Sequence, residues 1–329
     1  MKKISIVVAC YNESENILAL YQRVKNVFKD LNYNFEIIYV DNASIDNSEK
    51  IFENLAQADS RIKVIFMSRN FGSSQPSLLA GLRRAIGDSV VFLDGDLQDP
   101  PELILDFVEK WEQHYDVVYA VRKKRKGSIL RRIGYKIFYR IFKWLSYIDI
   151  PVDAGDCCLI DRKIVDILKN MQEKDLYIRG LRAWVGFKQT GIEYTREDRF
   201  TGKTSCNFFA NFFWAKKAIV NFSYKPLELI SKLASLTVFM SIIALFFYIY
   251  FGLKYSAPRG FTTLLVVVLF LGAIQLLSLS IIGEYLARMF EEVKGRPHYI
   301  IRKELNLDNS PEFCIENKNS FKNNNLENT

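Results

Sequence analysis

Two long stretches near the C-terminus, residues 233–253 and 260–283, contain no charged residue. About 20 consecutive apolar residues suffice for a helix to cross a bilayer, and buried helices of soluble proteins seldom lack charge for so long. We therefore expect two transmembrane helices within residues 226–288, rather than two core helices. Because only residues 254–259 join the two stretches, both ends of the pair would lie on one side of the membrane.

Upstream, short apolar runs alternate with helical patterns, which predicts a doubly wound α/β fold with a mostly parallel sheet. The runs rich in β-branched residues end at polar clusters, and each is followed by an amphipathic stretch. Residues 1–225 would form this domain. The expected strands are residues 3–9, 35–40, 62–67 and 89–93, and the expected helices are residues 14–31, 46–56 and 75–85.

Polar clusters follow three of these strands, at residues 11–13, 41–44 and 94–98. In parallel α/β sheets, ligands bind beyond the carboxyl ends of the strands. The three clusters are therefore expected to meet at one binding site. No Gly-x-Gly-x-x-Gly follows the first strand and no Walker-type glycine-lysine loop occurs, which argues against dinucleotide-binding dehydrogenases and P-loop enzymes.

The Asp94-Gly95-Asp96 sequence is suited to holding a divalent cation. Its two carboxylates are separated by a glycine that permits close backbone approach, and Gln98 offers a further oxygen. Mg²⁺ and similar hard cations take oxygen ligands and often bridge carboxylates to substrate phosphates. An Asp-x-Asp pair alone is also common in surface turns, so its position at a strand end carries the argument.

Two amphipathic stretches near residues 129–148 and 207–224 combine basic and aromatic residues. Such helices are typical of the headgroup layer of a membrane; the alternative for the first is a solvated helix packed on the domain.

The remaining composition bears on location. The net charge is +8, which suits an anionic membrane surface or an acidic substrate, and no nucleic-acid-binding module is present. The five cysteines follow no metal or disulfide spacing, which favours a reducing compartment. We expect a multi-pass protein of the inner membrane with the domain of residues 1–225, and the C-terminal segment 289–329, in the cytoplasm. The last ~20 residues are polar and are expected to be disordered.

Several longer motifs resemble the inverting family-2 glycosyltransferases. They are CYNESEN (from Cys10), YVDNASIDNS (from Tyr39), SRNFG (from Ser68) and FLDGDLQDPPELI (from Phe92). The resemblance continues through DAGDCCLIDRKIV, IRGLRAWVGFKQTGIEYTREDRFTGKTS, NFSYKPL and GEYLARMFEEVKGRPHYII, and so covers residues 3–301. It is closest to the polyprenyl-phosphate glycosyltransferases, the group of dolichol-phosphate mannosyltransferases and bacterial undecaprenyl-phosphate glucosyltransferases.

This resemblance implies a GT-A fold, Mg²⁺ or Mn²⁺, and a lipid phosphate acceptor. It implies a UDP-sugar donor, best matched by UDP-glucose, with N-acetylhexosamines and mannose as alternative sugars. Asp96 and Gln98 would hold the metal, and Asp94 would serve the metal or the ribose. Asp156 would be either a catalytic base or an orienting group. The implied donor-binding residues are Ala9, Tyr11, Glu13, Asp41 and Asp94, and the implied phosphate-binding residues are Arg122, Arg131, Arg196, Arg199 and Lys203. The resemblance also suggests a homo-oligomer, such as a tetramer, with residues 295–301 at a contact.

The chain departs from the family pattern at several positions. Ala9 stands for a proline and Asn42 for a second aspartate, while Cys157-Cys158 and Thr204-Ser205 stand where relatives carry Phe-Arg and Ser-Lys. The last two changes leave open a non-catalytic membrane scaffold as the alternative function. A processive polysaccharide synthase is a weaker alternative, because the chain has only two expected spans and no Gln-x-x-Arg-Trp segment.

Overall fold

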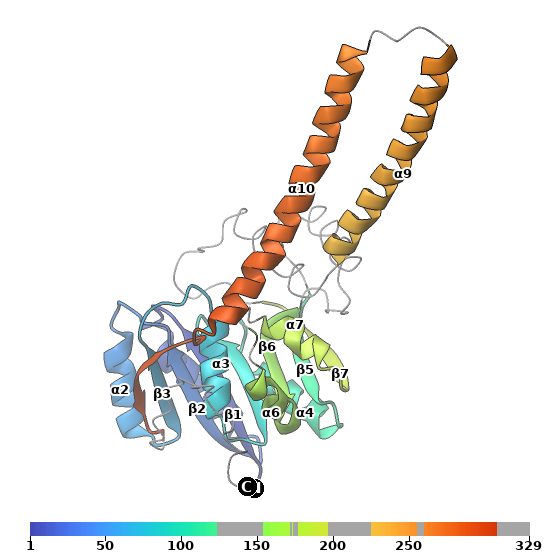
Figure 1. Ribbon diagram of the computed structural model, residues 1–329. Coiled ribbons are helices and arrows are strands. Elements are labelled where there is room, and N and C mark those ends of the chain that lie inside the picture. The colour runs from blue at the N-terminus through green and yellow to red at the C-terminus, as the bar shows by residue number, and fades with distance from the viewer. Residues whose placement is uncertain (124–153, 172, 174–176, 197–224, 255–259, 308–329) are drawn as a thin grey trace, which may run out of the picture. The chain divides into compact units, whose positions relative to one another are not determined.

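The computed structural model describes residues 1–123, 154–171, 173, 177–196, 225–254 and 260–307 (Figure 1). The chain divides into two compact units, which we call the α/β unit and the helical unit. The α/β unit comprises Met1–Ile129, Ile150–Ser205 and Arg296–Thr329, and the helical unit comprises Leu130–Asp149 and Cys206–Gly295. The two expected amphipathic helices and the expected disordered tail lie outside the described residues.

The α/β unit is built on an eight-stranded sheet with the order β7-β5-β6-β4-β1-β2-β3-β8. The strands are β1 (Lys3–Cys10), β2 (Asn34–Asp41), β3 (Ile62–Met67), β4 (Ser89–Asp94), β5 (Val117–Arg122), β6 (Ala154–Asp161), β7 (Gln189–Tyr194) and β8 (Ile301–Leu305). The helices are α1 (Ile17–Val27), α2 (Ser48–Ala58), α3 (Gln75–Arg84), α4 (Leu103–Glu112), α6 (Arg162–Asn170) and α7 (Ile178–Trp184).

The sheet is mixed rather than mostly parallel. Strands β1 to β4 pair in parallel, as expected, and β5 pairs in parallel with β7. Strand β6 runs antiparallel to both β4 and β5, and β8 runs antiparallel to β3. The expectation of a parallel sheet rested on strand–helix alternation in the first 95 residues, and these antiparallel pairings lie beyond that region.

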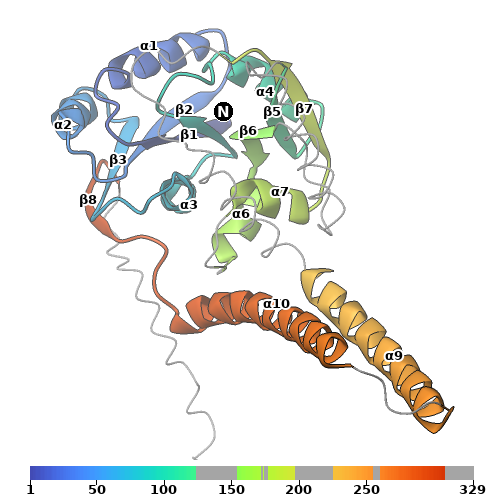
Figure 2. The ribbon, with the colours of Figure 1, turned by 90° about the horizontal axis from the view of Figure 1, so that it is seen from above.

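Helices cover both faces of this sheet (Figure 2). In α1 the apolar residues recur at helical spacing and are buried: Ile17, Leu20, Tyr21, Val24 and Val27. They join one apolar core with residues of α2, α4 and one face of β1, including Ile4, Ile6 and Val8. Helix α3 packs over β1 and β2 on the other face. Alternate residues of a strand point to opposite faces, so central strands buried on both faces become largely apolar, as β1 is from Ile6 to Cys10.

Strand β8 is formed by residues far downstream of the other strands and completes the sheet edge beside β3. Its register pairs Val64 with Leu305 and Phe66 with Lys303. The side chain of Asn306 donates to the carbonyls of Ala56 at 2.6 Å and Ile62 at 2.9 Å. Sequence periodicity did not indicate this strand.

The helical unit contains α9 (Lys225–Lys254) and α10 (Phe261–Lys294). Among the described residues, one segment is long and apolar enough to cross a membrane, Phe270–Lys294 in α10, with a mean hydropathy of 1.6. It begins and ends later than the expected span 260–283. The other expected span, 233–253, lies within α9, and its crossing of a membrane stays a prediction.

Candidate active site

The strand register brings the three polar clusters to one edge of the sheet. Cys10 is paired with Asp41 across β1 and β2, and Ala9 is paired with Asp94 across β1 and β4. Because these strands are parallel, their carboxyl ends, and the loops that follow them, lie side by side. The expected donor-side residues therefore lie close to the Asp94–Asp96 pair.

Gly95 is required by the close approach of this turn to β1. Its N–H donates to the Ala9 carbonyl at 3.0 Å. A Cβ on Gly95 would lie 2.8 Å from the Cys10 sulfur and 3.2 Å from the Ala9 carbonyl oxygen, closer than such contacts allow. It would also lie 3.5 Å from Cγ of Glu13. The glycine thus sets the Asp94–Asp96 turn against the end of β1.

Negative charge is crowded at the end of β4. Burial, followed by the negative charges of Asp156, Asp99 and Asp96, raises the pKa of Asp94 to about 7, against the opposing effect of Arg196. Asp96 is itself buried. Desolvation and like charges both favour the protonated carboxyl, so an added cation would stabilise the ionised form of Asp94.

The donor set at this turn fits a divalent cation shared with a substrate. Asp96 accepts a hydrogen bond from the backbone N–H of Gln98 at 3.2 Å. Across the described part of the chain, no group of three or more His, Cys, Asp or Glu side chains is arranged to hold a metal. Mg²⁺ is commonly held by one or two carboxylates plus substrate phosphates and waters, so the carboxylates of Asp94 and Asp96 suffice chemically.

The loops after β1 and β2 are joined by hydrogen bonds. The buried carboxylate of Asp41 accepts from the Ser44 backbone N–H at 3.1 Å and from the Ser44 hydroxyl, and burial raises the pKa of Asp41. The Asn12 side chain accepts from the Ile45 N–H at 2.9 Å. Tyr11 is 42% exposed, so its ring is available to a ligand above these loops.

Asn42, a departure from the family pattern, has a structural role that requires an amide. Its oxygen accepts from the Phe71 N–H at 3.1 Å, while its nitrogen donates to Asn70 Oδ1 at 3.2 Å and to the Ser73 carbonyl at 3.4 Å. An aspartate would keep the acceptor and lose both donors. Asn42 therefore fixes the loop after β3 beside the loop after β2.

Asp156 is held in a two-bond ion pair. The Arg179 guanidinium donates from Nε to Asp156 Oδ1 at 2.9 Å and from Nη2 to Oδ2 at 3.3 Å. Arg179 also donates to the Ala154 carbonyl at 3.2 Å. The sequence analysis did not single out Arg179, although it lies in the IRGLRAW segment that carried the resemblance. Cys158, where relatives carry an arginine, is fully buried in β6.

Two of the expected phosphate-binding residues, Arg122 and Arg196, lie around a buried carboxylate that the sequence analysis missed. Arg196 Nε donates to Asp99 Oδ1 at 3.2 Å, and Arg122 Nη2 lies 3.9 Å from Asp99 Oδ2. The hydroxyl of Tyr194 also donates to Asp99. The motif containing Asp99 was recognised, but nothing local to it indicated partners about 95 residues away. The remaining expected phosphate-binding residues lie outside the described residues: Arg131, Arg199 and Lys203.

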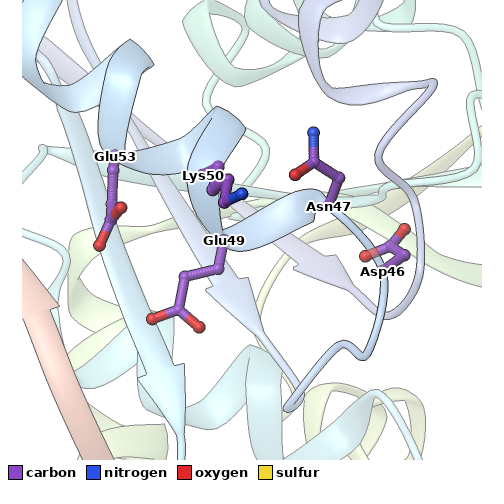
Figure 3. A pocket seen from close by; sticks show the side chains of 5 residues that line it. All are labelled: Asp46, Asn47, Glu49, Lys50 and Glu53. Atoms are coloured by element: carbon purple, nitrogen blue, oxygen red, sulfur yellow. The ribbon is translucent and has the colours of Figure 1, made fainter.

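A surface hollow at the start of α2 contains none of the expected site residues (Figure 3). Two of its acidic side chains are already paired with β8, Glu49 with Arg302 at 2.7 Å and Glu53 with Lys303. The hollow is lined by Asp46, Asn47, Glu49, Lys50 and Glu53.

Known proteins place this architecture in a family. Residues 5–168 match the model of glycosyl transferase family 2. The uncharacterized glycosyltransferase YkcC of Bacillus subtilis is 42% identical over 307 residues, covering 93% of this chain and 95% of that protein. The chain belongs to glycosyl transferase family 2.

Other relatives of this family-2 glycosyltransferase have names that include an acceptor, bactoprenol. The prophage bactoprenol glucosyl transferase homolog of Escherichia coli is 36% identical over 306 residues, which cover 92% of this chain and 99% of that one. The bactoprenol glucosyl transferase of Shigella phage SfII is also 36% identical, over 304 residues that cover 92% and 98%. The recognition of the family from the strand-end motifs is thus confirmed.

Proposed function

We propose that this glycosyltransferase moves one sugar, best matched by glucose from UDP-glucose, to a polyprenyl phosphate such as undecaprenyl phosphate at the cytoplasmic membrane face. The product would be a lipid-phosphate-linked sugar for modification of cell-envelope glycans. The observation that carries the proposal is the meeting, at one sheet edge, of crowded carboxylates with arginines that can bind phosphate. Relatives described as bactoprenol glucosyl transferases over nearly their full length support the choice of acceptor.

In this proposal the donor's nucleoside lies over the loops after β1 and β2. Tyr11 is exposed for contact with the base, and Asp41 and Glu13 supply carboxylates for ribose hydroxyls. Ala9 is buried at the end of β1, and its carbonyl accepts from the Gly95 N–H, which holds the neighbouring turn in place. The bonds that join these loops keep their side chains in place before the donor arrives, which lowers the cost of ordering them on binding.

The reaction proposed is an inverting displacement. A phosphate oxygen of the acceptor attacks the anomeric carbon, the bond from that carbon to the donor diphosphate breaks, and the leaving nucleoside diphosphate takes the electron pair. A phosphate monoester has a second pKa of about 6, so the acceptor oxygen is largely deprotonated at neutral pH. Both oxygens of Asp156 are engaged by Arg179, which supports an orienting role for Asp156 over that of a base.

A divalent ion, Mg²⁺ or Mn²⁺, would be held by Asp96, Gln98 and Asp94, and as a Lewis acid it would stabilise charge on the leaving diphosphate. The chain's own contribution is to place these groups. Gly95 sets the turn against β1, and the buried position of Asp96 limits competing water.

We infer the side of the membrane on which the α/β unit lies from the order of the units along the chain. Segments of the α/β unit precede and follow the helical unit's Cys206–Gly295 in sequence. If α9 and α10 both cross the bilayer, the start of α9 and the end of α10 must lie on the same side of the membrane as the α/β unit. Lysines and arginines such as Lys225, Arg288 and Lys294 flank that side, in the manner of cytoplasmic segments. Assembly into a homo-oligomer, such as a tetramer, is proposed on the family resemblance alone.

The test uses the full-length protein in lipid nanodiscs, with undecaprenyl phosphate, Mg²⁺ or Mn²⁺, and a panel of radiolabelled nucleotide-sugars. The expected result is one labelled lipid-phosphate sugar, formed from one donor and abolished by EDTA. Label reaching no polyprenyl phosphate from any donor would overturn the function and favour a scaffold. A polymeric product would instead indicate a synthase, and transfer that survives EDTA would overturn the metal assignment alone.

A further inference from the structure

Asp99 brings together residues from three separate parts of the chain. It follows the metal-binding turn after β4, and its side chain is fully buried. Tyr194 ends β7 and Arg122 ends β5, and the parallel register places these two residues opposite each other. Arg196 follows two residues after Tyr194. The carboxyl ends of β4, β5 and β7 therefore meet at this one carboxylate.

Asp99 contacts two arginines and a tyrosine hydroxyl. Its Oδ1 accepts from the Tyr194 hydroxyl and from Arg196 Nε. Its Oδ2 accepts no hydrogen bond from the described residues and has Arg122 Nη2 at 3.9 Å. Arg122 in turn donates from Nε to the Tyr194 oxygen at 3.3 Å. One carboxylate thus contacts two guanidinium groups, and Asp94 is a second carboxylate that interacts with Arg196.

The two arginines remain open to a ligand while the carboxylate does not. The side chains of Arg122 and Arg196 are 25% and 29% exposed, against 0% for Asp99. Arg122 Nη2 also lies 3.5 Å from where a Cβ of Gly155 would be, next to the Asp156–Arg179 pair. A guanidinium group offers five donors in a planar fork that suits phosphate, and these two have donors to spare.

We propose that Asp99 is a positioning residue. From its buried position it holds Arg122 and Arg196, so that their remaining donors bind a phosphate at the carboxyl edge of the sheet. This inference rests on the proposed function for the identity of the phosphate. It is either the acceptor lipid's phosphate or the donor's diphosphate. Pre-positioning matters because a long, flexible arginine otherwise loses rotamer freedom when it binds.

The decisive variant is Asp99→Asn in the full-length protein. Asparagine keeps the size of the side chain and an oxygen for Tyr194 and Arg196, but it removes the charge and turns a donor towards Arg122. We expect KM for one substrate, the lipid phosphate or the nucleotide-sugar, to rise about 10-fold, with kcat changed less than about threefold. The substrate affected identifies which phosphate is bound. Tyr194→Phe, which removes the hydroxyl linking Asp99 to Arg122, should raise the same KM by a smaller factor.

A matched control is available at Asp59, which also binds a tyrosine hydroxyl and an arginine. Asp59→Asn should leave both KM values unchanged. Equal loss of kcat with both KM values unchanged in Asp99→Asn would overturn the inference, because it would indicate a structural role. A lower KM would also overturn it, because Asp99 would then only screen the arginines.

A binding measurement separates this inference from the proposed function. Undecaprenyl phosphate or UDP should raise the thermal unfolding midpoint of the wild-type protein, and Asp99→Asn should lose that rise for one of the two ligands. If the wild type transfers no sugar but this loss is seen, the function fails and the positioning role stands. Equal shifts in both proteins would overturn the positioning role, whatever the activity.

Discussion

Two aspartates with similar partners lie at opposite edges of the same sheet. Asp59 follows α2 and precedes β3, at the amino edge, and Asp99 follows β4, at the carboxyl edge. At Asp59 both oxygens are used. Arg61 donates from Nε to Oδ1 at 2.9 Å and from Nη2 to Oδ2 at 2.6 Å, and Tyr21 donates to Oδ2 at 2.9 Å. One carboxylate meets one guanidinium, and the pair is complete.

Asp99 has the same kinds of partner in a different ratio. It faces two arginines rather than one, and within the described part of the chain no group donates to its Oδ2. A complete pair stabilises the fold, whereas an incomplete one leaves cationic groups available to an anion. The comparison therefore predicts that changes at the carboxyl edge reduce activity, and changes at the amino edge reduce stability.

The largest expected effect is that of Asp96→Asn. Loss of a metal-binding carboxylate should lower kcat about 100-fold or more, since Lewis-acid stabilisation contributes several kcal/mol. The free energy of unfolding should stay equal or rise, because like charges at the end of β4 are relieved. Transfer assays in Mg²⁺ and Mn²⁺, with urea unfolding, measure both. Unchanged kcat would contradict the role of Asp96. It would also contradict the expectation that changes at the carboxyl edge reduce activity.

Gly95→Ala should affect both activity and stability. The added Cβ would lie 2.8 Å from the Cys10 sulfur, and overpacking of this kind costs roughly 1–3 kcal/mol. The shifted turn should also lower kcat about 10-fold, because the carboxylates on either side would be misplaced. Adding Cys10→Ala removes the sulfur and should restore part of the stability in a double-mutant cycle. Full stability in Gly95→Ala alone would show that the turn can move away from β1.

Asp59→Asn should lower the free energy of unfolding, because it removes the ion pair with Arg61. The loss should be only about 1 kcal/mol, because Arg61 is partly exposed and solvent screens the pair. Hydrogen bonds from Arg61 hold the pKa of Asp59 below its usual range. The stability it provides is therefore complete above the unfolded-state pKa of about 4, and is lost as pH falls towards the lowered value. Urea unfolding of wild type and variant at pH 7 and pH 3 should show a smaller difference at pH 3. A constant difference would attribute the effect to packing.

The smallest effect is expected for Arg302→Ala, on β8. Arg302 pairs with Glu49 at 2.7 Å, but the two side chains are 50% and 36% exposed. Exposed ion pairs contribute about 0–1 kcal/mol. Removal of the side-chain amide in Asn306→Ala, which donates to two carbonyls, should cost more in the same unfolding experiment. A larger loss of stability in Arg302→Ala than in Asn306→Ala would mean that the ion pair, rather than hydrogen bonding, holds β8 against the sheet.

Much of the sheet was predictable from local sequence, and the missed parts share a cause. Helix α3, expected at residues 75–85, is Gln75–Arg84, and the strand expected at 89–93 is Ser89–Asp94. Their periodicity is local, so a short window reveals them. The antiparallel strands β6 and β8 pair with strands distant in the chain, and no local pattern specifies such a partner.

The candidate site likewise has a part that could be predicted from local sequence and a part that could not. Asp41 and the Asp94–Asp96 turn follow strands directly, so their meeting could be inferred from the rule for parallel sheets. The partners of Asp99 and Asp156 could not, because Tyr194, Arg196 and Arg179 reach them only after the sheet has formed. Their positions depend on β7 and α7, which lie outside the alternating pattern.

The late position of β8 in the chain sets an order for folding. During synthesis, strands β1 to β7 emerge before α9 and α10, while residues 301–305 come only after both long apolar helices. Until then the backbone of β3 presents an open edge, and such edges pair readily with other chains. Nascent molecules on neighbouring ribosomes would therefore be most vulnerable to mispairing during this interval. Chaperones that shield open strands would matter most then, and a chain terminated before residue 301 would keep that vulnerability permanently.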